Sequence, residues 1–300
     1  MIVCKSGDII EMPSVIMLGM FDGLHIGHKK LIETAVSAAE KRKMQTVLYT
    51  FSSNPDPQKA SVITNEQKIR LCRELNVDCV FFEDFTEDFK RKSPAQFIEY
   101  LKHSLNAALV VAGFDYRFGF MHKGSISDLE NCGFDLIVVP EVRIGGEKVS
   151  STAIRDYIEN GEIKKANAML GYPFCFDGTV TRGRSVGRKL GFRTANIAPP
   201  KGIVIPKDGV YATKTYIDKK CCNSVTNIGS NPTFDLKSVT VETHIFGFDG
   251  HLYGDNIRLE FYDYLRGEIK FSSKEELSAQ IAHDVETAEK ILEDTDVYKG

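Results

Sequence analysis

The segment Gly19-Met20-Phe21-Asp22-Gly23-Leu24-His25-Ile26-Gly27-His28 joins an apolar run at residues 15–18 to a segment of helical periodicity over residues 28–42. The apolar run predicts a buried strand, and apolar residues three and four positions apart predict the helix. Glycines at such a strand–helix junction let the backbone turn tightly and approach a ligand closely. The junction therefore predicts an α/β domain with a ligand site where the strand ends.

The rest of the first half repeats this alternation of strand and helix. Runs rich in apolar and β-branched residues predict strands, and Ser93-Pro94 predicts the start of a helix, because proline is favoured in a first helical turn. The further strands are expected at residues 45–51, 79–82, 109–112 and 136–139. This rhythm predicts a Rossmann-like parallel sheet covered by helices.

The second half has a different pattern. Helices are expected from Ser150-Ser151-Thr152 onward and over residues 163–170, and Gly171-Tyr172-Pro173 then breaks the pattern. We place a domain boundary there, which gives domains at residues 1–171 and 172–300. Strand candidates then follow one another without long helices, at residues 176–181, 210–217, 224–228, 239–246 and 257–262. They predict a small antiparallel β-barrel, closed by a terminal helix over residues 274–293.

Composition limits the classes of partner. The 300 residues are 42% hydrophobic and 26% charged, with a formal net charge of −3, so no broad basic surface for nucleic acid or anionic membrane is expected. The seven cysteines form no C-x-x-C pair, which argues against a disulfide framework or a zinc site. The sequence shows no apolar signal segment and no run of membrane-spanning length. These features predict a cytoplasmic protein that binds small molecules.

His25 and His28 flank Gly27 at the start of the first helix. A helix N-terminus offers unpaired N–H groups and a partial positive charge, which suit phosphate. Imidazoles there can donate hydrogen bonds to phosphate oxygens as charge develops on a leaving pyrophosphate. A surface loop with two incidental histidines is the plainer alternative, and an H-x-x-H metal site is another, although no third ligand at helical spacing stands nearby.

A second unusual segment spans residues 178–196. Five basic residues and four glycines lie together, and Thr194-Ala195-Asn196 ends the segment. A flexible, positively charged backbone can wrap a polyphosphate, and the oxygens of Thr194 and Asn196 suit Mg²⁺. The alternative is a solvated basic loop.

The first of these segments resembles the adenylyltransferase module of the prokaryotic riboflavin kinase/FAD synthetases, within the nucleotidyltransferase superfamily. Gly113-Phe114-Asp115-Tyr116-Arg117-Phe118-Gly119 and Ser150-Ser151-Thr152-Ala153-Ile154-Arg155 are similar to later motifs of that module. The resemblance implies that His25 and His28 act on ATP phosphates and that Asp115 lines the nucleotide and flavin pocket. The implied ATP- and phosphate-binding residues are Gly19, Phe21, Asp22, Gly23, Gly27, Asp115, Ser151, Thr152 and Arg155. A hydroxyl cap followed one turn later by arginine also suits an anion on chemical grounds, although a plain helix cap has the same pattern.

The segment over residues 178–196 resembles the loop of the family's riboflavin kinase module, and Val241-Glu242-Thr243-His244 resembles the strand that bears the catalytic glutamate. The resemblance implies that Glu242 is the base toward the flavin 5′-hydroxyl and that Thr194 and Asn196 bind Mg²⁺ with ATP. An exposed strand residue is the alternative for Glu242. The implied ATP-binding residues are Gly178, Gly183, Gly187, Arg188, Gly191, Thr194 and Asn196.

Two positions depart from the family pattern. Asn54 stands where the family has the histidine of P-H-P, and Arg193 stands where it has the proline of P-T-A-N. The expected function is phosphorylation of riboflavin to FMN and adenylylation of FMN to FAD, with ATP, riboflavin and FMN as substrates. The alternatives are a chain with one working activity, a flavin or nucleotide sensor that regulates a partner, and adenylyl transfer to another acceptor.

Overall fold

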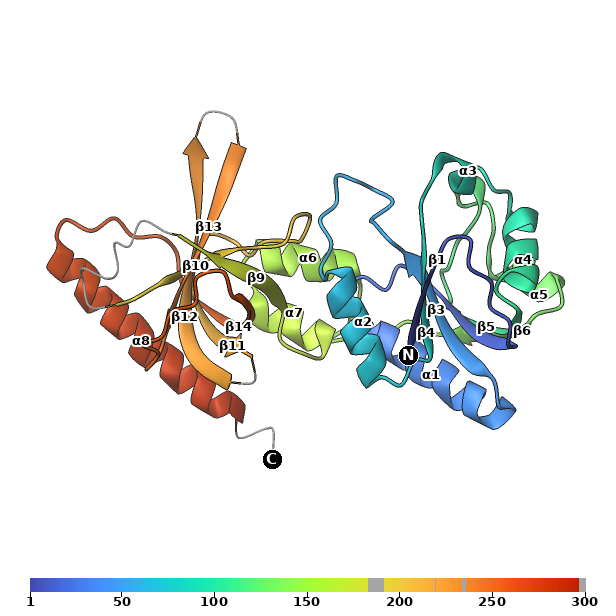
Figure 1. The fold of residues 1–300 in the computed structure, drawn as a ribbon, viewed down its shortest axis with the longest axis horizontal. Helices are drawn as coiled ribbons and strands as arrows, with labels where there is room; N and C mark the ends of the chain where they lie inside the picture. The colour runs from blue at the N-terminus through green and yellow to red at the C-terminus, as the bar shows by residue number, and fades with distance from the viewer. Residues whose placement is uncertain (183–191, 219, 234–235, 297–300) are drawn as a thin grey trace. The chain divides into compact units, whose positions relative to one another are not determined.

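The computed structural model describes residues 1–182, 192–218, 220–233 and 236–296. The chain divides into two compact units, Met1–Ser151 and Thr152–Gly300. In Figure 1 the first unit runs from blue to green and the second from green to red. This division places the two helices that follow residue 150 in the second unit, whereas the sequence pattern predicts a domain boundary at residue 171.

The first unit is built on a six-stranded sheet in the order β1-β4-β3-β2-β5-β6, in which every neighbouring pair is parallel. The strands are β1 (Ile2–Lys5), β2 (Ser14–Leu18), β3 (Gln45–Phe51), β4 (Cys79–Glu83), β5 (Ala107–Gly113) and β6 (Asp135–Val139). A β-ribbon of β7 (Arg143–Ile144) and β8 (Glu147–Lys148) follows. The predicted parallel sheet is confirmed.

Helices cover both faces of this sheet (Figure 1). Ile16 and Leu18 of β2 belong to an apolar core with Phe97 and Leu101 of α4, whereas α1 packs against β2, β3 and β5. Strand side chains alternate between faces, so the buried Val15 of β2 lies on the other face from Ile16. The helices are α1 (Ile26–Arg42), α2 (Asn65–Glu74), α3 (Glu87–Lys90), α4 (Pro94–His103) and α5 (Ile126–Asn131), with a 3₁₀ turn at Phe120–His122.

The strand order reverses direction beside β2. From β2 the chain moves outward through β3 and β4 on one side, and it later adds β5 and β6 on the other. Ligands of open α/β sheets bind at such a switch point, outside the carboxyl ends of the strands. Gly19 follows β2 and Gly113 ends β5, so the two predicted glycine-bearing motifs meet at this point of the sheet.

The second unit begins with α6 (Ser151–Glu159) and α7 (Ile163–Leu170) and continues as a closed barrel in the order β10-β13-β12-β11-β14-β9. All strand pairs are antiparallel. The strands are β9 (Cys175–Thr181), β10 (Ala195–Ala198), β11 (Gly209–Ile217), β12 (Lys220–Thr233), β13 (Leu236–Ile245) and β14 (Asn256–Arg266). The terminal helix α8 (Lys274–Asp296) packs Ala288 and Leu292 against the barrel. The predicted barrel and terminal helix are confirmed.

The sequence pattern missed several of these elements: β1, α2, α3, the 3₁₀ turn at Phe120–His122, α5, the β7–β8 ribbon and β10. None of the helices in the described part of the chain is both long and apolar enough to cross a membrane.

Candidate active sites

The carboxyl edge of the parallel sheet carries two adjoining cavities. Their volumes are about 260 Å³ and about 690 Å³. Gly19, Asp115 and Tyr116 line both of them. The smaller cavity also contains His25, His28 and Ser151, so the structure brings together the histidine motif and the two later motifs in the first unit.

His25 and His28 form a stacked pair at the start of α1. Their ring centroids are 3.6 Å apart with an interplanar angle of 14°, and the ring of Phe21 lies 5.1 Å from that of His28. The backbone N–H of His28 donates to Nδ1 of His25 over 3.2 Å. Nδ1 of His25 is therefore unprotonated, and the proton of the neutral ring is on Nε2. A Cβ on Gly27 would lie 3.2 Å from the His25 ring, so glycine makes room for this arrangement.

Both imidazoles are neutral at physiological pH. Burial lowers the pKa of His25 to about 4. Burial, with the neighbouring His25 and Lys68, holds the pKa of His28 well below its usual range. Among the described residues, Nδ1 of His28 is a buried nitrogen without a hydrogen-bond partner. Such an atom costs about 1–3 kcal/mol, and a ligand that hydrogen-bonds to it would remove that cost.

We expect the first unit to lose stability in mild acid, because an unfolded His25 binds a proton below about pH 6.5 and the folded one only near pH 4. The protonation of His25 alone lowers the free energy of unfolding by about 2 kcal/mol between pH 7.5 and pH 5.0. Urea unfolding followed by circular dichroism at both pH values measures this change. His25→Asn should show a loss about 2 kcal/mol smaller than the native chain, and equal losses would contradict the assignment.

The turn before α1 holds its shape through Asp22. Oδ1 of Asp22 accepts hydrogen bonds from the backbone N–H groups of Val62 and Ile63, at 2.7 Å and 3.4 Å. Asp22 is buried and does not line either cavity, so in the structure it anchors the turn behind the site. Phe21 and Gly23 are likewise outside the two linings, and Gly23 has a φ of 80°, which glycine adopts without strain.

Two other predicted residues stand at the cavity itself. Oδ2 of Asp115 forms an ion pair with Nζ of Lys148 at 2.5 Å, and Nζ of Lys148 also lies over the ring of Phe114. The Ser151 hydroxyl donates to the carbonyl oxygen of Asp22 over 2.7 Å, which ties the start of α6 to the turn. Thr152 and Arg155 follow in α6 and belong to the second unit. Their role toward phosphate stays a prediction.

The larger cavity is aromatic and cationic, which the sequence analysis missed. Its lining contains aromatic side chains from β3, from the segment after β4, from α4 and from the segment after β5, with cations beside them. These residues are Tyr49, Phe51, Phe85, Phe89, Lys90, Lys92, Phe97, Tyr116, Arg117, Phe118, Phe120 and His122. Such a lining suits a flat aromatic ligand that carries an anionic group. The dense aromatic and basic spacing of residues 81–92 was the available signal.

Asn54, the first departure, does not line either cavity. Its Nδ2 donates to the carbonyl oxygen of Lys59 over 3.1 Å, and its Oδ1 accepts from the backbone N–H of Asp56 at 3.0 Å. Pro55 and Asp56 of the same loop line the aromatic cavity. Asn54 therefore shapes the loop that borders this cavity, through both ends of its carboxamide.

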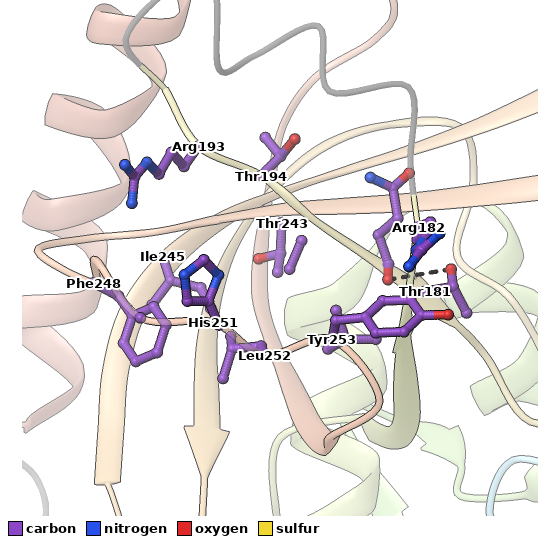
Figure 2. Close-up of a pocket in the computed structure, with 14 residues that line it drawn as sticks. Thr181, Arg182, Arg193, Thr194, Thr243, Ile245, Phe248, His251, Leu252 and Tyr253 are labelled. Carbon is purple, nitrogen blue, oxygen red and sulfur yellow. Dashed lines mark hydrogen bonds between the residues drawn. The ribbon is translucent and has the colours of Figure 1, made fainter.

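In the second unit, a cavity of about 380 Å³ lies against the barrel between the segment around Thr194 and the segment 248–253. Figure 2 shows Thr181, Arg182 and Tyr253 at one end of it and Phe248 and His251 at the other. The guanidinium of Arg182 lies 5.1 Å from the centre of the Tyr253 ring. An arginine stacked on tyrosine beside polar groups suits a ligand with both an aromatic ring and phosphates.

A second cavity, of about 580 Å³, adjoins the first. Thr194 lines both cavities. Glu242 lines the second with Asn227, Glu268 and residues of α8, and Asn196, which lines the first, is the direct cross-strand partner of Glu242. Directly opposed side chains lie on the same face of a sheet, about 5 Å apart. The structure therefore brings Thr194, Asn196 and Glu242 together at the joint between two cavities.

Of the remaining predicted residues in the 178–196 segment, one is described by the structure and four are not. Gly178 lies in β9, where a Cβ would come within 2.5 Å of Ile197, so this glycine allows β9 and β10 to pair closely. Gly183, Gly187, Arg188 and Gly191 lie outside the described residues.

Arg193, the second departure, forms an ion pair of 2.8 Å with Asp249. Its carbonyl oxygen lies 2.8 Å from Nδ1 of His244. These two contacts attach the segment before Thr194 to β13 and to the loop that follows it. In this chain they hold the segment that proline would otherwise stiffen.

Comparisons with known proteins agree with the two-unit organisation. The FAD synthetase family model matches residues 9–153, and the riboflavin kinase family model matches residues 170–292. The bifunctional riboflavin kinase/FMN adenylyltransferase of Listeria monocytogenes is 35% identical over 289 residues, which cover 91% of this chain and 91% of that protein. The protein of the same name from Bacillus subtilis is 35% identical over 291 residues, or 92% and 91% of the two chains. A crystal structure described as a macrolide-efflux protein from Streptococcus pneumoniae has a TM-score of 0.90 and 30% identity, and covers 96% of this chain and 99% of that one.

Proposed function

The chain belongs to the family of bifunctional riboflavin kinase/FMN adenylyltransferases, and from that premise we propose how its two units divide the work. The two reactions of the family are phosphorylation of riboflavin to FMN and adenylylation of FMN to FAD. We assign adenylyl transfer to residues 1–171 and phosphorylation to residues 172–300. Both reactions take ATP as the second substrate.

One observation carries this assignment: each unit has two cavities that share lining residues. In the first unit Gly19, Asp115 and Tyr116 belong to both, and in the second unit Thr194 does. Group transfer between two substrates needs both bound side by side with the reacting atoms about 3 Å apart. Paired cavities with a common wall meet that need.

For adenylyl transfer, we infer that ATP phosphates lie against the histidine pair and that FMN occupies the aromatic cavity. An oxygen of the FMN phosphate attacks the α-phosphorus of ATP, and pyrophosphate leaves. His25 and His28 are neutral, so each is an N–H donor that can hydrogen-bond to the phosphate oxygens on which charge develops. Lys90, Lys92 and Arg117 supply positive charge for the FMN phosphate.

For phosphorylation, we infer that ATP occupies the cavity with Arg182 and Tyr253 and that riboflavin occupies the cavity with Glu242. The carboxylate of Glu242 orients the 5′-hydroxyl of riboflavin and accepts its proton as the oxygen attacks the γ-phosphorus, the bond to the β-phosphate breaks and ADP leaves. Thr194 lies at the joint, where the phosphoryl group passes from one cavity to the other.

Mg²⁺ fits the donor set at that joint. The hydroxyl of Thr194 and the carboxamide oxygen of Asn196 border the same cavity, and Mg²⁺ takes few protein oxygens together with water and nucleotide phosphates. When bound, the ion neutralises phosphate charge. The ATP-binding roles of Thr152, Arg155, Gly183, Gly187, Arg188 and Gly191 are part of the same proposal.

Two incubations with ATP and Mg²⁺, one with riboflavin and one with FMN, followed by chromatographic separation of the flavins, test the assignment. We expect FMN to appear first and FAD to follow. Accumulation of FMN without FAD would show that only the second unit works, and turnover of FMN but not of riboflavin would show that only the first does. No turnover of either flavin would overturn the proposal in favour of a binding protein.

A further inference from the structure

A lysine is buried directly behind the adenylyl-transfer site. Lys68 lies in α2 with 5% of its surface exposed, and it lines neither cavity of the first unit. Its Nζ donates to the carbonyl oxygen of Met20 over 2.9 Å and to Oγ1 of Thr50 over 3.0 Å. Thr50 donates in turn to the same Met20 carbonyl over 2.8 Å. One peptide of the glycine-bearing turn is therefore held by two donors from α2 and β3.

Burial of an ammonium group is unfavourable unless its donors are satisfied and charge is compensated. Beyond its two acceptors, Lys68 has titratable and aromatic neighbours on several elements. The turn contributes the carboxylate of Asp22, α1 contributes His28 and α2 contributes Cys72. The ring of Phe82 in β4 lies 5.9 Å from Nζ. Lys68 is therefore a buried cation with protein hydrogen-bond acceptors, and not a solvated surface lysine.

The peptide that Lys68 holds stands at a strained part of the turn. Phe21 has a φ of 48° and Leu24 a φ of 36°, values that residues other than glycine rarely adopt. The chain has no cis peptide bonds in its described part, so the N–H of Phe21 points opposite to the Met20 carbonyl. Fixing that carbonyl on Lys68 fixes the direction of the N–H and the path of the chain into His25.

We propose that Lys68 is a positioning residue for adenylyl transfer: its ammonium group holds the Met20–Phe21 peptide in the strained turn that leads into the histidine pair. This inference rests on the proposed function of the first unit. Lys68 lines neither cavity, and it acts through the turn that it holds.

Lys68→Met tests the proposal, because methionine keeps an unbranched side chain and removes the charge. We expect kcat for FAD formation from FMN to fall about 100-fold, the order of effect of misplaced reacting groups, while the KM values for FMN and ATP change less than threefold. Riboflavin phosphorylation by the same preparation should be unchanged and reports that the second unit is folded, while the retained KM values report the folding of the first. Arg73→Met removes an exposed charge from the same helix and should leave both activities unchanged.

The pH profile supplies a readout that a purely structural role would not move. Burial lowers the pKa of Lys68 to about 8, although Asp22 and Cys72 oppose the shift. FAD formation by the native chain should therefore fall as pH rises from 7.5 to 9.5, and Lys68→Met should lack this fall. Between pH 8 and 10.5, the usual pKa of lysine, the unfolded chain keeps the Lys68 proton and the folded chain has lost it. The titration of Lys68 therefore raises the free energy of unfolding with pH over this range, so loss of stability through Lys68 does not account for a fall in rate.

Two results would overturn the inference: a Lys68→Met chain with native kcat, or a variant that keeps the native alkaline fall. If Lys68→Met is insoluble, the native profile decides alone, and a rate that stays level up to pH 9.5 sinks the idea. Failure of the proposed function is distinct, because the native chain would then make no FAD from FMN at any pH.

Discussion

Replacing His28 by alanine should abolish the formation of FAD from FMN while the formation of FMN from riboflavin continues. His28 is neutral, stacked on His25, and carries a buried ring nitrogen that no protein group satisfies among the described residues. Removal of a donor aimed at developing charge reduces kcat by about 10²–10³, or roughly 3–4 kcal/mol. Rates with FMN and with riboflavin as separate substrates measure the two reactions.

His103→Ala is the matched control. This histidine lies in α4 of the same unit, with 78% of its side chain exposed, and pairs with Glu99 on the surface. Its replacement should leave both reactions at native rates. The assignment of two separate sites would be wrong if His28→Ala slowed both reactions equally in a chain whose circular dichroism is native.

The sheet and the barrel were predictable because their strands carry local signals. Buried strands such as β3 are continuous runs of β-branched and aromatic residues, and α1 has its apolar residues at helical spacing. The edge strand β1 lacks such a signal, since it is short and leaves Ile2 and Val3 exposed. Helix α2 was missed for a related reason, because its buried residues are Gln67, Lys68 and Cys72, which form no apolar stripe.

The candidate sites were predictable only where residues of one short motif contact the same ligand. His25 and His28 are one turn apart, and Thr194 and Asn196 are two positions apart in an extended segment, so spacing alone sets them side by side. The aromatic cavity is assembled from distant segments of the first unit, so the aromatic and basic residues within 81–92 indicate only part of its lining. The sequence also did not reveal that the Asp22 side chain turns inward to bind the backbone before α2. That direction depends on tertiary packing.

Replacing Glu242 by alanine should have the opposite effect to His28→Ala: riboflavin phosphorylation is lost and supplied FMN is still converted to FAD. Glu242 lies in β13, opposite Asn196, and is half-buried at the wall of the cavity that we assign to riboflavin. A positioned general base contributes about 10²–10⁴ to the rate, so kcat should fall within that range. Glu242→Gln should be nearly as slow, because the amide keeps the shape and hydrogen-bonding capacity but does not accept the proton at neutral pH.

The Gln variant separates catalysis from folding. It preserves the packing of β13 against β10 and β12, so its thermal unfolding should match that of the native chain. Glu289→Gln, an exposed change in α8, controls for the loss of one negative charge and should phosphorylate riboflavin at the native rate. A Glu242→Gln chain that phosphorylates riboflavin within tenfold of the native rate would show that another group takes the proton. Glu268, which lines the same cavity, is the carboxylate to replace next.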